Sequence, residues 1–477
     1  MKGSRLEERE SMRICMVAEG CYPYVVGGVS GWINSMIKAF PEYEFVILAI
    51  ISNREQSGRF KYTLPDNVVE VREVYLEDAE WGRMKPKKRR LTRKQYNALY
   101  GLVMNENTDW DTLFDMFAGH RLSIDELLMG PDFFSAVRDC YNARYGNMIF
   151  SDFLWTMRSM YLPLFFTLAS DIPKADLYHC VATGYAGILG CMAKHRYKCG
   201  LIVSEHGIYT REREEELIKA EWLDAEFKNL WIEQFRKMSY AAYQRADIVT
   251  SLYAHAKELQ IELGCPEDKA VITPNGIDTG RFADIAGRAP DDRYINIGAV
   301  LRVTPIKDVK TLIMAFAYAK AKVPMLKLWI MGPCDEDEQY AKECYALVEN
   351  MQLEDVVFTG RVNVDEYIGR MDFTILTSIS EGQPLTILES FAAHKPVIAT
   401  DVGNCYGLIH GEKDDYGDAG IVTHIMNMEE IAGAITKLAL DEKLRQAMGD
   451  NGYARVMSGY RLEDMRKTYR ELYSQFE

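Results

Sequence analysis

Short apolar runs alternate with longer helix-like stretches along most of the chain. Apolar runs bounded by turn residues are typical of buried strands, whereas apolar residues that recur every three or four positions indicate helices. In the C-terminal half this alternation is regular, and it predicts strands at 295–300, 326–331, 356–359, 372–377 and 396–400 with helices at 309–322, 336–350 and 385–393. Such alternation is typical of βαβ units that build a parallel sheet with helices on both faces.

The N-terminal half alternates in the same way from Arg13 to about Phe282, except over residues 78–170. There the pattern becomes helical, and we interpret it as a helical insertion into the first domain. A chain of 477 residues is expected to form two large domains rather than one core. The predicted organisation is a disordered segment 1–11, a first domain 12–285, a second domain 286–457 that follows a linker within 283–293, and a terminal helix 458–477.

The terminal segment carries one apolar stripe, formed by Met465, Tyr469, Leu472 and Phe476 at helical spacing. A single apolar stripe requires a surface that buries it. That surface can belong to the first domain or to the domain that the helix follows.

Composition is that of an ordinary globular protein, with 48% hydrophobic and 26% charged residues. The net charge of −14 argues against a nucleic-acid-binding surface. One basic cluster interrupts the acidic balance, and it consists of Lys85, Lys87, Lys88, Arg89, Arg90, Arg93 and Lys94. This cluster can be a solvated loop, or it can contact an anionic membrane or an acidic partner.

Ten cysteines are scattered without a C-x-x-C pair, which argues against a zinc site or a thioredoxin-type motif. We expect these scattered cysteines to be reduced thiols, which are typical of cytoplasmic proteins, so the cysteine pattern predicts a cytoplasmic location. The first ten residues lack an apolar signal core. The most apolar stretch, residues 160–169, is shorter than the roughly 20 residues that a membrane-spanning helix needs.

The most informative motif places Glu381 and Glu389 eight positions apart, where a predicted strand leads through a loop into a helix. Gly382 permits close approach of the backbone to a ligand, Pro384 fits a first helical turn, and the free amides of residues 383–386 can face a pyrophosphate. Two separated carboxylates can accept hydrogen bonds from hydroxyl groups on two parts of an extended ligand, such as a nucleoside diphosphate sugar. The alternative is a helix whose start is capped by an acidic residue.

Two cations follow another predicted strand, Arg302 directly and Lys307 five positions later. Ligands of parallel sheets collect outside the carboxyl ends of the strands, so these cations can neutralise a pyrophosphate leaving group. Solvated surface charges are the alternative.

Two further signals lie in the first domain. Gly27 and Gly28 open a helix after the first strand, which would bring amides close to a phosphate or sugar. His206 follows a strand at 199–204 and precedes a glycine, so it can point into a cleft and donate a hydrogen bond. An ordinary turn and a structural histidine are the alternatives.

Along the chain, the glycine pair comes first, followed by His206, the turn Pro274 to Asp278, the two cations and the two carboxylates. This order resembles that of the retaining GT-B glycosyltransferases of family GT4. More narrowly, three features resemble the PelF glycosyltransferases of the bacterial Pel exopolysaccharide system: the segment 27–30, the long segment between the first strand and residue 170, and the segment 205–212. The resemblance implies an α/β fold with two Rossmann-like parallel-sheet domains that face a cleft, and a C-terminal helix that crosses back onto the first domain. One departure is Asp401 to Asn404, where many relatives carry a second glycine.

The resemblance also implies roles for individual residues. It places Glu381 on the donor hexose, Glu389 on the ribose and His206 near the transferred sugar. The implied catalytic positions are His206, Arg302, Lys307 and Glu381. The implied nucleotide-sugar positions are Gly27, Gly28, Arg361, Val362, Gly382, Gln383, Pro384, Leu385 and Glu389.

The implied activity is transfer of a hexose from a UDP-sugar, with UDP-glucose favoured, to a growing exopolysaccharide or related acceptor, with retention and without a required metal. Membrane-bound synthase or export subunits are implied as partners, with the enzyme in the cytoplasm or held peripherally at the inner membrane through them. A GT-B-shaped UDP-sugar epimerase and a non-catalytic assembly subunit of a polysaccharide synthase remain as alternatives.

Overall fold

The computed structural model describes residues 11–477 except 53, 78–89, 121 and 413. The chain divides into two compact units, Met1–Ile272 with Leu472–Glu477, and Thr273–Glu471. The division lies thirteen residues before the predicted boundary at 285, because Ile277 and Phe282 are buried in a core cluster of the second unit. Most of the segment 1–11 and most of the basic cluster lie outside the described residues.

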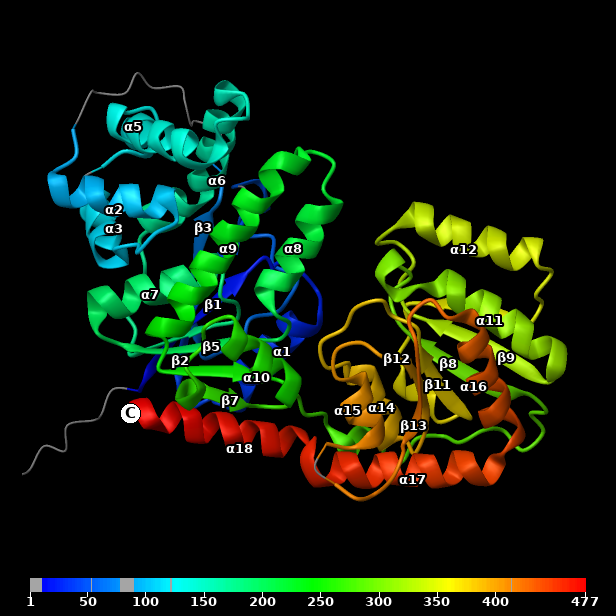
Figure 1. The fold of residues 1–477 in the computed structure, drawn as a ribbon. Coiled ribbons are helices and arrows are strands. Elements are labelled where there is room, and N and C mark those ends of the chain that lie inside the picture. Colours follow the sequence, from blue (N-terminus) through cyan, green and yellow to red (C-terminus); the bar gives the residue numbers. More distant parts are fainter. Residues whose placement is uncertain (1–10, 53, 78–89, 121, 413) are drawn as a thin grey trace, which may run out of the picture. The chain divides into compact units, whose positions relative to one another are not determined.

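The first unit is built on a seven-stranded parallel sheet in the order β3-β2-β1-β4-β5-β6-β7. Its strands are β1 (Arg13–Glu19), β2 (Glu44–Ile51), β3 (Val68–Tyr75), β4 (Leu177–Cys180), β5 (Gly200–Glu205), β6 (Ile248–Ser251) and β7 (Ala270–Ile272). The central strands are almost wholly buried, as expected for a parallel sheet with both faces covered. The covering helices are α1 (Gly28–Ala39), α7 (Tyr185–Tyr197), α8 (Tyr209–Lys219), α9 (Ala225–Arg245) and α10 (Ala254–Glu262) (Figure 1).

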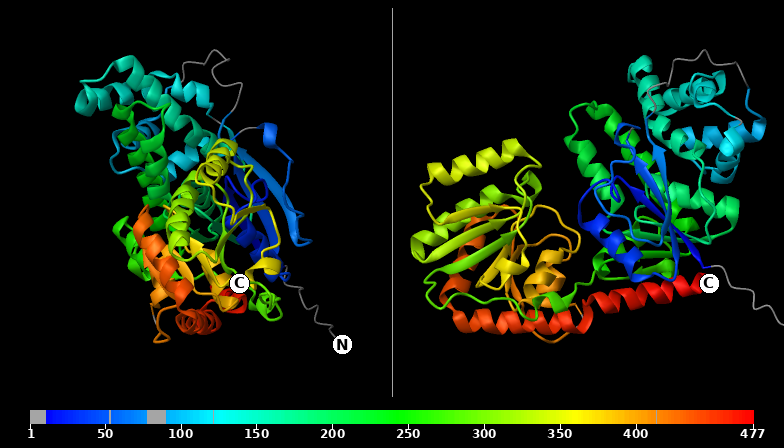
Figure 2. Two further views of the ribbon diagram at one scale, coloured as in Figure 1. Left: turned by 90° about the vertical axis from the view of Figure 1, so that its right-hand side faces the viewer. Right: turned by 180° about the vertical axis from the view of Figure 1, so that it is seen from behind.

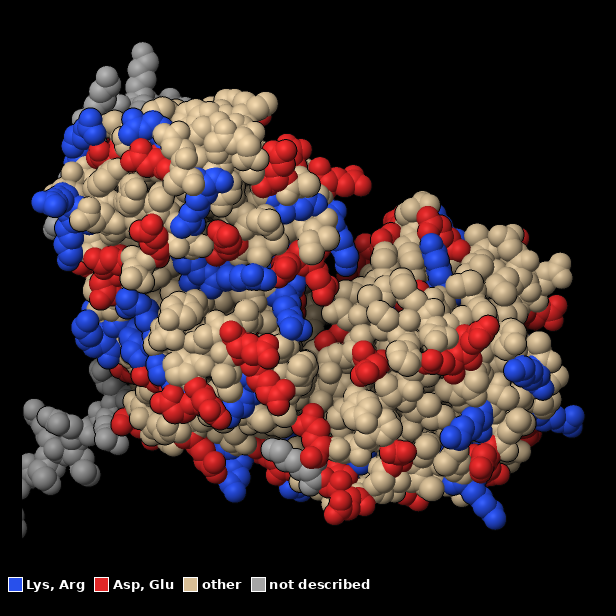
Figure 3. Space-filling model, viewed as in Figure 1, with Lys and Arg blue, Asp and Glu red and all other residues tan. Residues whose placement is uncertain are grey.

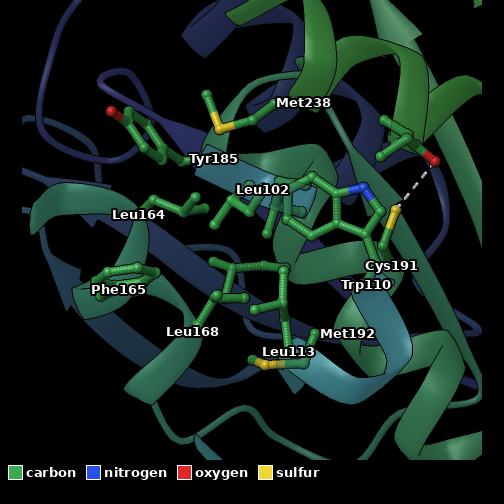
Figure 4. Close-up of a cluster of buried hydrophobic side chains, with 14 of the residues drawn as sticks. Leu102, Trp110, Leu113, Leu164, Phe165, Leu168, Tyr185, Cys191, Met192 and Met238 are labelled. Atoms are coloured by element: carbon green, nitrogen blue, oxygen red, sulfur yellow. Dashed lines mark hydrogen bonds between the residues drawn. The ribbon is translucent and has the colours of Figure 1, made fainter. Parts of the chain in front are cut away.

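The predicted insertion is helical and lies between β3 and β4. It contains α2 (Arg93–Met104), α3 (Trp110–Phe117), α4 (Ile124–Leu128), α5 (Pro131–Cys140) and α6 (Phe150–Ala169). These helices gather at one side of the first unit (Figures 1 and 2). Their apolar side chains, such as Leu102, Trp110 and Leu164, share one core with Cys191 of α7 and Met238 of α9 (Figure 4). The insertion is therefore an integral part of the first unit.

The second unit contains a six-stranded parallel sheet in the order β10-β9-β8-β11-β12-β13. Its strands are β8 (Ile295–Val300), β9 (Leu326–Met331), β10 (Val356–Gly360), β11 (Phe373–Leu376), β12 (Val397–Thr400) and β13 (Gly420–Thr423). Its helices are α11 (Val309–Lys322), α12 (Glu338–Asn350), α13 (Asp365–Ile368), α14 (Leu385–Ala392), α15 (Cys405–His410), α16 (Met428–Leu440), α17 (Glu442–Gly459) and most of α18 (Leu462–Tyr473). The bounds predicted from the alternating pattern agree with these elements within two residues, and two parallel-sheet, Rossmann-like units confirm the predicted fold class.

The C-terminal end of the chain belongs to the first unit, although α18 begins in the second. The Tyr473 hydroxyl and His179 Nδ1 are 2.7 Å apart, and the Tyr43 hydroxyl donates to Glu477 Oε1 at 2.6 Å. Phe476 packs so tightly against Gly200 that a Cβ there would lie 2.3 Å from its ring. The last six residues are thus fixed by polar and apolar contacts within the first unit.

Acidic and basic side chains are interspersed on the face shown in Figure 3, without a continuous basic surface. Among the described residues, no helix combines the length and apolarity needed to cross a membrane.

One buried cation ties the second unit together. The Arg455 guanidinium is 1% exposed and donates to both carboxylate oxygens of Asp414 at 2.8 Å. It also donates to the carbonyl oxygens of Leu408, Ile409 and Gly417 at 2.8–2.9 Å. The hydrogen bonds from Arg455 lower the pKa of Asp414. Arg455 therefore organises the segment between α15 and β13.

We predict that Arg455→Met destabilises the second unit by about 3–5 kcal/mol, because it leaves a half-buried carboxylate and three carbonyl groups without their donor. Since the pKa of Asp414 is lowered in the folded state, the stability that this pair contributes is present above the unfolded pKa of about 3.9 and is lost as the pH falls through the folded pKa. Thermal unfolding at pH 7 and below pH 4 measures both effects. The exposed Arg293→Met serves as control, and an unchanged melting temperature for Arg455→Met contradicts the prediction.

Candidate functional site

Both sheets reverse their strand order once, between β1 and β4 in the first unit and between β8 and β11 in the second. At such a point the connections after neighbouring strands run to opposite sides and leave a crevice at the carboxyl edge of the sheet. The predicted site residues of the second unit lie in the loops after β8, β10 and β11 or within α14.

Lys307 and Glu381 meet at the reversal point of the second sheet. Lys307 Nζ lies 2.5 Å from Glu381 Oε1, and the Ser378 hydroxyl donates to the same oxygen at 2.6 Å. The two charged side chains are only 15% and 13% exposed. The loops themselves are joined, because the amide of Ile379 donates to the Ile306 carbonyl oxygen at 2.8 Å. The structure therefore brings together one predicted cation and one predicted carboxylate that are 74 positions apart.

The backbone at Glu381 and Gly382 is supported by the loop after β12. Gly403 has a φ of +54°, and a Cβ there would lie 2.3 Å from the carbonyl oxygens of both Glu381 and Gly382. The amide of Asn404 donates to the Gly382 carbonyl oxygen at 2.8 Å. The single glycine of the segment 401–404 is thus required by this close approach.

The start of α14 is free of a side-chain cap. Pro384 is its N-cap residue rather than its first helical residue, and Leu385 begins the helix and is 36% exposed. The buried Gln383 accepts a hydrogen bond at 2.7 Å from the amide of Asn275, so it holds the turn that the sequence placed after β7. Because no side chain caps the helix, its first amides can face an anionic group.

Glu389 lies farther along α14 and has a cationic neighbour that the sequence did not indicate. Arg281 Nη1 is 3.4 Å from Glu389 Oε1, and the same guanidinium pairs with Asp365 at 2.6 Å. Burial raises the pKa of Glu389, and the charge of Arg281 opposes that shift. Arg281 and Asp365 are 84 positions apart in sequence, so only the fold shows that they accompany Glu389.

Arg302 is not brought into contact with Glu381. Its Nη1 lies 2.5 Å and 2.7 Å from the carboxylate oxygens of Glu336, and both side chains are about half exposed. Glu336 follows β9, the neighbour of β8 on the side away from β11. Arg361 is exposed and Val362 half-buried, and both follow β10 at the edge of the sheet.

The first unit has a cavity of about 550 Å³ at the carboxyl ends of β1, β2, β4 and β5. This size is within the usual range of ligand cavities, about 300–1,000 Å³. It includes the predicted His206, and its other polar lining residues are Glu19, Tyr24, Ser52, Gln56, Tyr209, Glu212 and Arg213.

His206 is uncharged at neutral pH, because burial lowers its pKa to about 4. Its ring lies edge-on to Trp32 of α1 with centroids 4.6 Å apart. Nε2 is buried and has no hydrogen-bond partner among the described residues. An unpartnered buried polar atom costs stability, so its presence at a cavity wall is typical of a ligand-binding position.

Two carboxylates, the buried Glu205 and the half-buried Glu19, position the turn that carries His206. Glu205 accepts from the hydroxyl groups of Tyr243 and Thr183 at 2.6 Å and 3.2 Å and from the amide of Tyr209 at 3.2 Å. The Tyr209 hydroxyl in turn donates to Glu19 Oε1 at 2.7 Å. The sequence did not assign a role to either residue. The signal for Glu19 was its position at the end of the first strand, and the signal for Tyr209 was its place in the segment 205–212.

Gly27 and Gly28 are exposed at the start of α1. Apart from the adjacent residues of the chain, a Cβ at either position would meet no atom of the described residues within 4 Å, and neither residue has a left-handed φ. Packing and backbone strain therefore do not explain why glycine occupies these positions.

No group of three or more histidine, cysteine, aspartate and glutamate side chains is arranged to hold a metal ion within the part of the chain that the structure describes.

Solved structures with the same fold cover nearly the whole chain. Anabaena HepE in complex with UDP superposes with a TM-score of 0.62 at 15% identity, over 97% of this chain and all of that chain. Sucrose-phosphate synthase from Thermosynechococcus elongatus superposes with a TM-score of 0.61 at 16% identity, over 97% and 98% of the two chains. These likenesses show the GT-B fold.

Sequence relatives match mainly parts of the chain. The MMP alpha-(1->4)-mannosyltransferase of Mycolicibacterium hassiacum is 22% identical over 59% of this chain and 66% of its own. The N-acetyl-alpha-D-glucosaminyl L-malate synthase of Bacillus anthracis is 29% identical over 35% of this chain and 42% of its own. The chain thus spans between about two fifths and two thirds of these relatives.

Two families match consecutive parts of the sequence. Residues 12–268 match the family described as a domain of unknown function, DUF3492, and residues 282–455 match glycosyl transferases group 1. The chain therefore belongs to the DUF3492 family, and its second unit carries a domain of the glycosyl transferases group 1 family.

Proposed function

We propose that the protein is a retaining glycosyltransferase that transfers a hexose from a UDP-sugar, with UDP-glucose favoured, to a saccharide acceptor. The observation that carries this proposal is the Lys307–Glu381 pair beside the uncapped start of α14, at the reversal point of the second sheet. The match to glycosyl transferases group 1 over the same unit supports it. HepE structures with UDP and with UDP-glucose support the choice of donor.

In this proposal the second unit binds the nucleotide diphosphate. The amides at the start of α14 and the Lys307 ammonium bind the pyrophosphate and stabilise its charge as the bond to the anomeric carbon breaks. Arg302 joins them by exchanging Glu336 for a phosphate oxygen. That exchange costs little, because an exposed ion pair contributes about 0–1 kcal/mol.

The sugar and the ribose use the two carboxylates. Glu381 accepts from a hydroxyl group of the hexose once the phosphate attracts Lys307, and Glu389 accepts from the ribose hydroxyls. Arg361 and Val362 contact the base. His206 is neutral and donates to the transferred sugar from Nε2 or accepts from it there, according to its tautomer.

In the first unit, Gly27 and Gly28 permit close approach of a ligand, because an added Cβ at either position would meet no non-adjacent atom of the described chain within 4 Å. We assign the acceptor to this unit, as a growing exopolysaccharide of the Pel type or a related saccharide. This assignment rests on the resemblance of segments 27–30 and 205–212 to PelF glycosyltransferases. We further propose a cytoplasmic location, with peripheral attachment to the inner membrane through synthase or export subunits, and catalysis without a metal.

The reaction is tested with the donor alone and with added saccharides. Incubation of the full chain with UDP-glucose followed by NMR of the products is expected to show transferred glucose, or slow release of free glucose when no acceptor is present. Formation of a new UDP-sugar from the donor alone would indicate an epimerase, and an unchanged donor in all mixtures would indicate a non-catalytic subunit.

We predict that Lys307→Ala lowers the turnover number on the order of 10²- to 10³-fold, equivalent to about 2.7–4 kcal/mol, because it removes one cation from the departing diphosphate. Steady-state kinetics together with the melting temperature measure this effect. Lys342→Ala removes an exposed lysine of α12 and is the matched control. Turnover close to that of the wild type in a folded Lys307→Ala variant would remove Lys307 from the phosphate site.

We predict that Glu389→Gln weakens UDP binding by about 10- to 100-fold, because a hydrogen bond to a charged group contributes about 1.5–3 kcal/mol. Calorimetric titration with UDP measures the change, and uridine as a second ligand tests whether the loss follows the nucleoside. Glu349→Gln, an exposed substitution on α12, is the control. Equal affinity of the variant and the wild type would exclude contact between Glu389 and the ribose.

A further inference from the structure

The cavity of the first unit has walls of mixed charge. Glu19, Glu212 and Arg213 all line it, together with the neutral His206. Its remaining wall is largely apolar and includes Val25, Val29, Leu76 and Val181. Two carboxylates and one guanidinium therefore face a space of about 550 Å³.

Two buried polar groups of this wall lack a partner within the described part of the chain. The buried nitrogens His206 Nε2 and Arg213 Nε have no hydrogen-bond partner among the described residues. Glu212 is an exposed residue of the same wall, whereas Glu19 accepts from Tyr209 and from the amide of Ala186. Buried polar groups are satisfied in most proteins, so these two orphaned nitrogens indicate a ligand that supplies a hydrogen-bond acceptor to Arg213 and a partner to His206.

The turn after β5 positions Glu212 in this wall. A Cβ at Gly207 would lie 1.9 Å from Glu212 Oε1, so only glycine allows the carboxylate to lie over the turn that carries His206. Arg213 is fixed from the other side, because Nη2 donates to Glu216 at 2.9 Å and the guanidinium lies over the Tyr209 ring, with Cζ 5.4 Å from its centroid. Glu212 and Arg213 are thus placed by local packing.

The chemistry of the wall restricts the ligand. A carboxylate accepts hydrogen bonds only, a guanidinium donates only, and a hydroxyl group can satisfy either. An anionic ligand would be repelled by Glu19 and Glu212, and a cationic ligand would meet the Arg213 guanidinium. A neutral ligand with several hydroxyl groups fits both kinds of partner.

We infer that this cavity binds a neutral saccharide unit of the acceptor, and that Glu212 and Arg213 determine the preference for a neutral over a carboxylate-bearing sugar. The inference rests on the proposed glycosyl transfer and adds the acceptor class and the residues that select it. Glu212 accepts from one hydroxyl group of the sugar, and Arg213 Nε donates to another.

Ligand-observed saturation-transfer NMR on the full chain tests this inference with three probes: methyl α-glucoside, methyl α-glucuronide and methyl α-glucosaminide. The wild type is expected to bind the glucoside more tightly than either charged probe. Glu212→Gln keeps the shape of the side chain but removes its charge, so it is expected to raise the affinity for the glucuronide relative to the glucoside on the order of tenfold. Arg213→Gln is expected to shift the preference toward the glucosaminide.

The control is Glu215→Gln, an exposed substitution on the same helix at a residue that does not line the cavity, and it is expected to leave all three affinities unchanged. Calorimetric titration with UDP is run on each variant. If UDP binds and donor is consumed, but Glu212→Gln leaves the order of the probes unchanged, the inference is wrong and the proposed function stands.

Two other outcomes are also decisive. If wild-type protein neither binds UDP nor consumes donor, the proposed function fails, whatever the probes show. If the glucoside is displaced by UDP-glucose but not by UDP, the cavity holds the donor hexose, and the assignment of an acceptor unit is overturned.

Discussion

Parallel pairing of the strands is the constraint on which both candidate sites depend. In a parallel sheet all carboxyl ends lie at one edge, so loops that are distant in sequence become neighbours there. The Lys307–Glu381 contact joins loops 74 positions apart in this way. The same rule brings the ends of β1 and β5 to one cavity in the first unit, and with them Glu19 and His206. Neither site would exist if the strands alternated in direction.

The two units hold their charged groups by different means. In the first, Glu205 accepts at least three hydrogen bonds from neutral donors, which is how a buried carboxylate without a cation can be tolerated. Burial nevertheless raises its pKa. In the second, Lys307 and Glu381 neutralise one another directly. The hydrogen bonds to Glu205 fix the turn that carries His206. In the proposed function, an anionic ligand replaces Glu381 as the partner of Lys307.

Much of the second unit could be predicted from the sequence because its strands are buried on both faces and read as continuous apolar runs. The helix at 309–322 was predicted with its observed bounds. Lys307 and Glu381 could be assigned to the same kind of ligand because each follows a strand, but their direct contact was not predicted. The partner of Glu389 could not be predicted, since Arg281 is 108 positions away and no local pattern marks it.

The insertion shows a different limit. Its helical periodicity was visible, but the burial of Leu102 and Trp110 against Met238 of α9 depends on tertiary packing that periodicity does not encode. For the same reason the domain boundary was placed too late. Composition marked residues 283–293 as a linker, whereas the packing of Ile277 assigns the preceding turn to the second unit.

Arg302 and Lys307 both follow β8, but they form ion pairs with different partners. Lys307 reaches the loop after β11, and Arg302 reaches Glu336 after β9, so the two side chains pair on opposite sides of β8. The Lys307 pair is largely shielded from solvent, whereas the Arg302 pair is half exposed and correspondingly weak. In the proposed function, a diphosphate at this edge therefore recruits Arg302 at little cost, and Lys307 exchanges Glu381 for a phosphate oxygen without leaving its position.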